Sequence, residues 1–140
     1  MEKIQSFRQT LGGSYNFPYY DFTWCTVGLE ASEIARDYLK ITRNLSDETI
    51  GKFKLGYDPL KGNITIPETK NGEIVNIAYR TTDETQKIKY TKEKGCENWI
   101  FNEGALEIAK KKQGILIVSN QFDAMSAYQA GFENVVSVPV

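Results

Sequence analysis

The sequence contains no histidine and only two cysteines, and both shortages narrow the chemistry open to it. Without histidine, catalytic triads that use an imidazole, histidine acid–base catalysis and most transition-metal sites are excluded. Cys25 and Cys96 lie far apart and form no CxxC pair, which argues against a zinc site. We expect both to be buried thiols of a cytosolic protein rather than a disulfide.

Long apolar runs and a strong net charge are also lacking. No window approaches the length of a membrane span, and residues 1–13 are polar, without the apolar segment of a secretory signal. We therefore expect a soluble, cytoplasmic protein with no membrane partner. The net charge of -1 over 140 residues gives no global attraction to nucleic acid, so any such binding must come from local patches.

What the chain does contain is a strand–helix–strand pattern near its C-terminal end. Ile115 to Val118 is a continuous aliphatic run, typical of a parallel strand buried on both faces. A helix is predicted from Asp123 to Gln129, Gly131 is its left-handed cap, and Val135 to Val138 is the second strand. The turn Ser119-Asn120-Gln121 then lies at the carboxyl end of the first strand, where open α/β sheets keep ligand sites.

Residues 1–28 include an aromatic-rich stretch from Tyr15 to Trp24, with Tyr15, Phe17 and Tyr19 at alternate positions. It is either a stacking platform for unpaired bases or an extended arm whose aromatic face packs on the domain. The lack of basic residues between Phe17 and Trp24 favours the packed arm.

Three further helices are predicted, of which the first two are interpreted as scaffold. The first, Glu30 to Lys40, carries an apolar stripe that comprises Ile34, Ala35, Tyr38 and Leu39. The second begins at Ser46 as N-cap, directs Ile50, Phe53 and Leu55 to the core, and ends at Gly56. The third runs from Glu103 to Lys112, with Asn102 as its N-cap.

Residues 57–101 predict an antiparallel meander. Asn71-Gly72 is the strongest hairpin signal, between the strands Ile64–Ile66 and Ile74–Thr82. Asp83-Glu84 begins another turn that leads to a strand from Gln86 to Lys92.

Alternation along these strands predicts a cationic patch. It would bring Arg80, Lys87 and Lys89 to one sheet face, an arrangement suited to phosphates. The same lysines also fit a solvated strand face that protects the sheet edge from aggregation.

The C-terminal pattern resembles the opening unit of a Toprim domain, the metal-dependent phosphoryl-transfer fold of bacterial and phage DNA primases and of topoisomerases. The matching positions are Ile115 to Val118, Asp123, Ala124, Gly131, Asn134 to Ser137 and Pro139. Ser119 stands where the family has its glutamate, and Asn120 stands where it has glycine. The later aspartate pair that holds magnesium in the family has no counterpart before Val140.

Segments further upstream resemble the core of phage primases and primase-helicases. They are Asp37 to Asp58, Asn63 to Pro67, Gly72 to Arg80, Lys89-Tyr90, Lys94-Gly95 and Trp99 to Asn102. Their order and spacing match the family from about Tyr38 to Pro139.

The resemblance implies an α+β N-terminal subdomain, with short helices and an antiparallel meander, leading into the first βαβ unit of an α/β Toprim-like fold. We divide the chain into an aromatic-rich arm at 1–28, a primase-core-like subdomain at 29–101 and a partial Toprim-like unit at 102–140.

The resemblance also implies which side chains bind nucleic acid or nucleotide: Arg80, Lys89 and Tyr90, with Lys87 beside them. No catalytic residue is predicted, because the Ser119 hydroxyl is a poor substitute for a carboxylate in a two-metal site. Asp123 is either a residual acidic site or a helix residue favoured by the dipole. No cofactor is expected for this chain, whereas an intact relative would use magnesium.

The function expected from the resemblance is that of a part, or a degenerate relative, of a DNA primase. Such a protein binds single-stranded template and nucleotides for RNA primer synthesis and is inactive alone. The alternative is a non-enzymatic regulatory protein of phage or plasmid replication that binds nucleic acid or protein. The expected partners are single-stranded DNA and a replicative helicase or other replication protein.

Overall fold

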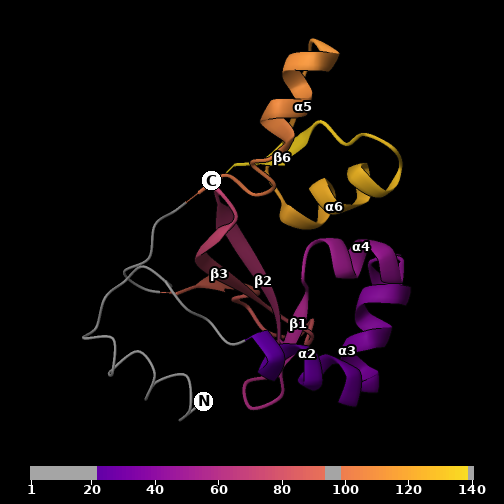
Figure 1. Ribbon diagram of the computed structural model, residues 1–140. Coiled ribbons are helices and arrows are strands. Elements are labelled where there is room, and N and C mark those ends of the chain that lie inside the picture. The colour runs from indigo at the N-terminus through magenta and orange to yellow at the C-terminus, as the bar shows by residue number, and fades with distance from the viewer. Residues whose placement is uncertain (1–21, 94–98, 139–140) are drawn as a thin grey trace, which may run out of the picture.

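The protein is described by a computed structural model that covers residues 22–93 and 99–138 (Figure 1). The helices that come first are α2 (Phe22–Ala31), α3 (Glu33–Asp37), the π-helix η1 (Tyr38–Thr42) and α4 (Asp47–Lys52). The strands β1 (Gly56–Asp58), β2 (Asn63–Lys70), β3 (Glu73–Thr81) and β4 (Tyr90–Lys92) follow. The C-terminal elements are α5 (Ala105–Lys112), β5 (Leu116–Val118), α6 (Gln121–Gln129) and β6 (Val135–Ser137).

Strands β1 to β4 form an antiparallel sheet in the order β1-β2-β3-β4, which confirms the predicted meander. The turn between β2 and β3 contains Asn71 at φ 54° and Gly72 at φ 81°. Two-residue hairpin turns of this kind require positive φ at both positions, and asparagine followed by glycine meets that requirement at least cost. The hairpin was therefore predictable from two residues.

Strand β4 is shorter than the predicted strand from Gln86 to Lys92. The Asp83 carboxylate accepts hydrogen bonds from Thr85 N (2.9 Å), Thr85 Oγ1 (2.6 Å) and Gln86 Nε2 (3.2 Å). This side-chain network closes a local turn, which competes with strand pairing. Lys87 consequently lies outside the ladder, as an exposed residue.

The first predicted helix is interrupted. Ser32 is extended, and its Oγ accepts a hydrogen bond from Ala35 N at 3.1 Å, so it caps a new helix, α3. The predicted burial of Ile34 was wrong, since its side chain is 70% exposed, whereas Ala35, Tyr38 and Leu39 are buried. The predicted extended arm is helical from Phe22, and its residues 15–21 lie outside the described residues.

The cap of α4 was predicted correctly, but its end was not. Ser46 Oγ accepts a hydrogen bond from Thr49 N at 3.2 Å, and Phe53 and Leu55 are buried. Gly56 does not end this helix; it opens β1. A Cβ atom at Gly56 would lie 2.5 Å from Cys25 Cβ, so this strand can approach α2 only without a side chain there.

The C-terminal segment is the predicted strand–helix–strand unit. Strands β5 and β6 are parallel, with Leu116 opposite Val135 and Val118 opposite Ser137. Gly131 has φ 104° just beyond α6, as predicted for a left-handed cap. The third predicted helix starts later than expected, at Ala105, because Asn102 has φ 64° and donates its side-chain amide to a carbonyl of β6.

The predicted burial of the first C-terminal strand on both faces was wrong. Leu116 is 41% exposed and Ile117 is 60% exposed, whereas all three residues of β6 are buried. Within the described part of the chain, β6 lies between β5 and a bridge to Phe101, and β5 is an edge strand. An aliphatic run alone does not distinguish an edge strand from a central one.

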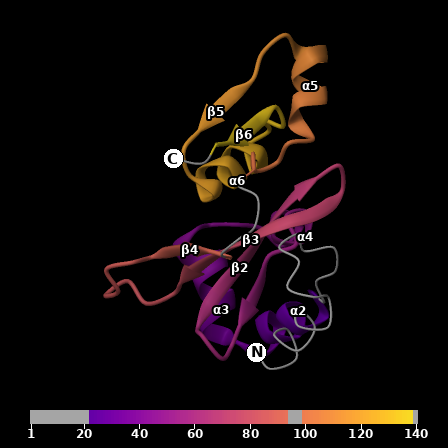
Figure 2. The same cartoon turned by 90° about the vertical axis from the view of Figure 1, so that its left-hand side faces the viewer.

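One hydrophobic core joins the sheet, the N-terminal helices and the C-terminal unit. Its fully buried members include Leu39 from η1, Ile64 and Ile66 from β2, and Phe122 and Met125 from α6. Helices α3 and α4 lie along one side of the sheet, and the C-terminal unit lies beyond one end of it (Figures 1 and 2). Among the described helices, none combines the length and apolar composition that a membrane span would need.

Candidate functional site

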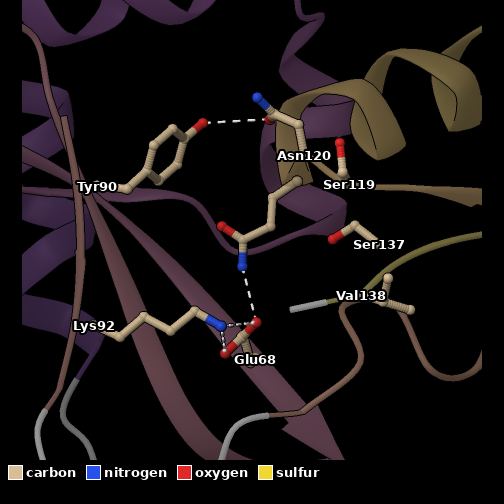
Figure 3. Close-up of a pocket in the computed structure, with 8 residues that line it drawn as sticks. Glu68, Tyr90, Lys92, Ser119, Asn120, Ser137 and Val138 are labelled. Atoms are coloured by element: carbon tan, nitrogen blue, oxygen red, sulfur yellow. Dashed lines mark hydrogen bonds and ion pairs between the residues drawn. The ribbon is translucent and has the colours of Figure 1, made fainter. Parts of the chain in front are cut away.

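The turn that precedes α6 borders a cavity of about 400 Å³ between the C-terminal unit and the sheet (Figure 3). The lining residues come from β2, β4, the turn, the start of α6 and the end of β6: Glu68, Tyr90, Lys92, Ser119, Asn120, Gln121, Ser137 and Val138. The turn therefore borders a cavity, at the strand end where the sequence predicted a ligand site.

Glu68 is a buried carboxylate in the wall of this cavity, with 2% of its surface exposed. Lys92 Nζ donates to both of its oxygens, at 3.0 and 3.1 Å, and Gln121 Nε2 donates to Oε2 at 3.0 Å. Burial raises the pKa of Glu68 above its ordinary value, and the charge and hydrogen bonds of its partners only partly oppose this. These three residues link β2, β4 and α6.

The raised pKa of Glu68 predicts how stability depends on pH. Between the ordinary pKa of 4.5 and the raised value, the unfolded chain releases a proton that the folded chain retains. Stability from this group is therefore greatest below the ordinary pKa and falls as pH rises through that window. Urea unfolding should be measured from about pH 4 to about pH 7 for the wild-type chain and for Glu68→Gln. The difference in their free energies of unfolding, in favour of the wild type, should shrink as pH rises. A difference that grows with pH would contradict the prediction.

Next to the cavity, two guanidinium groups lie against three aromatic rings, and we call this set the arginine–aromatic cluster: Tyr38, Arg43, Arg80, Tyr90 and Phe122. Arg43 Cζ lies 4.3 Å from the Phe122 ring centre and 5.4 Å from that of Tyr38. Arg80 Cζ lies 5.1 Å from the Tyr90 ring centre and 5.9 Å from that of Tyr38. Such cation–π contacts fix the planes of the guanidinium groups.

Arg43 was not predicted as a site residue. It follows the π-helix η1, and its backbone N–H donates to the Tyr38 carbonyl at 3.0 Å across the wider turn. Its Nε also donates to the Tyr38 hydroxyl at 3.0 Å. π-Helical turns occur often at functional sites, but no residue pattern in this segment predicts a π-helical turn.

Arg80 and Lys89 converge on one carboxylate, that of Glu84. Arg80 Nη2 donates to Glu84 Oε1 at 3.1 Å, and Lys89 Nζ donates to Oε2 at 3.0 Å. The Lys89 hydrogen bond, with the charges of Arg80, Lys89 and Arg43, holds the pKa of Glu84 below its ordinary value. Arg80 is only 4% exposed, and its Nε and Nη1 have no hydrogen-bond partner among the described residues.

This geometry corrects the predicted cationic patch. Arg80 lies opposite Tyr90 in the β3–β4 register, and its guanidinium lies close to that ring. Lys87 lies outside β4 and is not part of the group. Arg80 and Lys89 are instead brought together by Glu84, which the sequence placed only in a turn.

The turn residues have structural partners. Asn120 Oδ1 accepts hydrogen bonds from Phe122 N at 2.8 Å, as the N-cap of α6, and from the Tyr90 hydroxyl at 3.3 Å. Burial raises the pKa of Tyr90, which keeps this hydroxyl protonated. Ser119 is exposed on the cavity rim, whereas Asp123 is exposed in the first turn of α6 and does not line the cavity.

These residues do not fit a two-metal magnesium centre. The described residues contain no group of three or more acidic, cysteine or histidine side chains placed to hold a metal ion. The carboxylate that lines the cavity is already bound by an ammonium and an amide group. Hard divalent cations need several oxygen ligands at one point.

The chain matches no model of a known protein family, and no curated protein matches it in sequence. Its fold is similar to solved bacterial primase cores. The Aquifex aeolicus primase, in a structure of its zinc-binding and RNA polymerase domains, matches with a TM-score of 0.75 and 19% identity, over 84% of this chain and 39% of that one.

DNA is bound in two further structures with a similar fold. The RNA polymerase domain of Mycobacterium tuberculosis primase DnaG, bound to double-stranded DNA with a 6-nucleotide overhang, matches with a TM-score of 0.72 and 17% identity, over 84% of this chain. A DnaG catalytic domain bound to single-stranded DNA matches with a TM-score of 0.66 and 17% identity, over 97% of this chain. This chain spans 51% and 54% of their respective lengths. The chain thus has a primase-like α+β fold.

Proposed function

We propose that this chain is a primase-related protein that binds single-stranded DNA and does not synthesise primers by itself. The observation that carries the proposal is the arginine–aromatic cluster, with Lys89 beside it, on a primase-like fold. In this proposal, β5, α6 and β6 are the opening unit of a Toprim-like domain, and the cluster lies at its junction with the sheet.

The chemistry of the cluster suits a single strand. Arginine and lysine bind phosphate oxygens, while aromatic rings stack on unpaired bases irrespective of sequence. Lys89 is 40% exposed at its side chain and Tyr90 is 37% exposed, so both are accessible to a ligand. Arg80 is buried, so it orients the Tyr90 ring and can contact only a phosphate that takes the place of the Glu84 carboxylate.

The absence of catalysis follows from the residues at the turn. Ser119 and Asn120 supply a hydroxyl and an amide where the resemblance implies a glutamate and a glycine. Asn120 is committed to the cap of α6, so its side chain cannot hold a metal without freeing that helix end. We therefore assign magnesium chemistry to an intact relative, and a binding or regulatory role in replication to this chain.

Fluorescence anisotropy of a labelled single strand, measured across a salt series, tests this proposal. We expect binding that weakens with salt, with Arg43→Gln and Lys89→Gln each lowering the slope of log K against log salt by roughly 0.7. Lys112→Gln, at the exposed C-terminal end of α5, is the control and should change the slope less.

Two results would contradict the proposal. Affinity that is indifferent to salt would exclude phosphate contacts. Primer synthesis by the purified chain with magnesium would exclude the non-catalytic assignment.

A further inference from the structure

The cavity is chemically unlike a phosphate site. Its most buried charged group is the Glu68 carboxylate, which repels anions, and the ammonium of Lys92 is already paired with it. The other polar lining groups are amides and hydroxyls, which both donate and accept hydrogen bonds, and the Tyr90 ring and Val138 add apolar surface. A neutral ligand with donors next to acceptors matches this lining better than an anion does.

Several of these polar groups remain available. The Gln121 side-chain oxygen and the Asn120 side-chain amide group have no hydrogen-bond partner within the described residues, and Ser119 is exposed on the rim. Glu68 Oε1 accepts one hydrogen bond, from Lys92, and a carboxylate oxygen can accept two. The Glu68 oxygens therefore lie in the buried wall of the cavity, beside the Lys92 ammonium donor (Figure 3).

The size and position of the cavity also favour a single aromatic heterocycle as its ligand. A volume of about 400 Å³ lies within the usual range of small-molecule pockets, roughly 300–1,000 Å³. The Tyr90 ring lines both the cavity and the arginine–aromatic cluster, so a strand held at the cluster passes the mouth of the cavity. An unpaired base has the rotational freedom to turn into such a pocket, as bases do in enzymes that extrude them.

We propose that this cavity takes a single unpaired nucleobase, which is recognised by its hydrogen-bonding edge; this inference rests on the proposed binding of single-stranded DNA. The Glu68 carboxylate and the Gln121 side-chain oxygen accept from the base, and Lys92 donates to it. Because the deep acceptors favour a donor-rich edge, bases with an exocyclic amine are preferred over thymine and uracil. Glutamate accepting from the cytosine amine is a known pairing in base recognition.

Deoxycytidine and deoxyuridine provide the cleanest comparison, because they differ on one edge of the base: cytosine has an amine at C4 and an unprotonated N3, whereas uracil has a carbonyl at C4 and a hydrogen on N3. Single strands of the two, equal in length and phosphate number, are titrated by anisotropy at one salt concentration. We expect about tenfold tighter binding of the deoxycytidine strand. Equal affinity for the two strands would overturn the base pocket while leaving the proposed function intact; binding of neither would overturn both.

Variants test whether the preference for deoxycytidine over deoxyuridine arises in the cavity. Glu68→Gln should lose the preference for deoxycytidine, and Glu73→Gln, at the exposed start of β3, should retain it. Ser119→Leu fills the cavity from its exposed rim without removing the ion pair, so it tests the pocket even where Glu68→Gln fails to fold. It should abolish the preference and keep salt-dependent binding; a preference retained in this variant would overturn the inference.

Discussion

The Glu84→Gln variant is expected to bind single-stranded DNA about fivefold more tightly than the parent chain at roughly 0.1 M salt. Glu84 is 53% exposed at its side chain and receives hydrogen bonds from both Arg80 and Lys89. Its carboxylate thus occupies the position that a phosphate would take between these cations. An amide in its place carries no charge and holds the two cations less strongly.

The magnitude follows from counterion release. One additional phosphate contact on a single strand changes the slope of log K against log salt by roughly 0.7, which is about fivefold between 1 M and 0.1 M salt. The gain should therefore appear as a steeper salt dependence. It should vanish near 1 M salt.

Glu107→Gln is the matched control. Glu107 is 76% exposed and pairs with Lys110 on α5, so this variant removes the same charge from an ion pair away from the cluster. If both variants raised the affinity equally, net charge alone would explain the gain. If Glu84→Gln bound no better than the parent, Glu84 would not compete with phosphate.

Phe122→Ala is expected to have the largest effect on stability, a loss of about 3–5 kcal/mol in the free energy of unfolding. Phe122 is 2% exposed and belongs to the core shared by the sheet and the C-terminal unit. Its ring lies 6.2 Å from that of Tyr38 and 6.4 Å from that of Tyr90. Truncation leaves a cavity at this junction and removes the ring beneath Arg43.

Urea unfolding followed by tryptophan fluorescence measures this loss. Phe132→Ala removes the same ring from an exposed position, 58% exposed, and should change stability by less than about 0.5 kcal/mol. A small loss for Phe122→Ala would mean that the C-terminal unit does not share its core with the sheet.

Local chemistry made several elements predictable from the sequence. Positive φ at Asn71 and Gly72 needs only those two residues, and the cap of α4 needs only the Ser46 hydroxyl and a nearby amide. The strand–helix–strand unit follows from two aliphatic runs joined by a helical segment that ends at Gly131. The hairpin turn and the caps depend on contacts within a few positions of the chain, which a sequence displays directly, whereas the parallel strands were predictable because a helical crossover joins them.

Other elements were missed because a polar side chain formed local hydrogen bonds that interrupted the helix or strand expected from the apolar pattern. The Ser32 hydroxyl interrupts a helix that its apolar spacing favoured, and the Asp83 carboxylate shortens β4. Both residues form hydrogen bonds with nearby backbone amides, and whether these override the longer pattern depends on packing around them. The exposure of Ile117 likewise depends on which strands lie beside it.

By itself, the sequence determined the α+β composition, the hairpin and the parallel unit, and it identified the residues to inspect: Arg80, Lys87, Lys89, Tyr90, Asp123 and the turn at Ser119. Only the tertiary structure brought Glu68 to Gln121, 53 positions away, or Arg43 to the Phe122 ring. Those contacts arise from docking α6 against the sheet and η1. No periodicity within one element encodes which side chains then meet, because that depends on how separate elements pack around a common core.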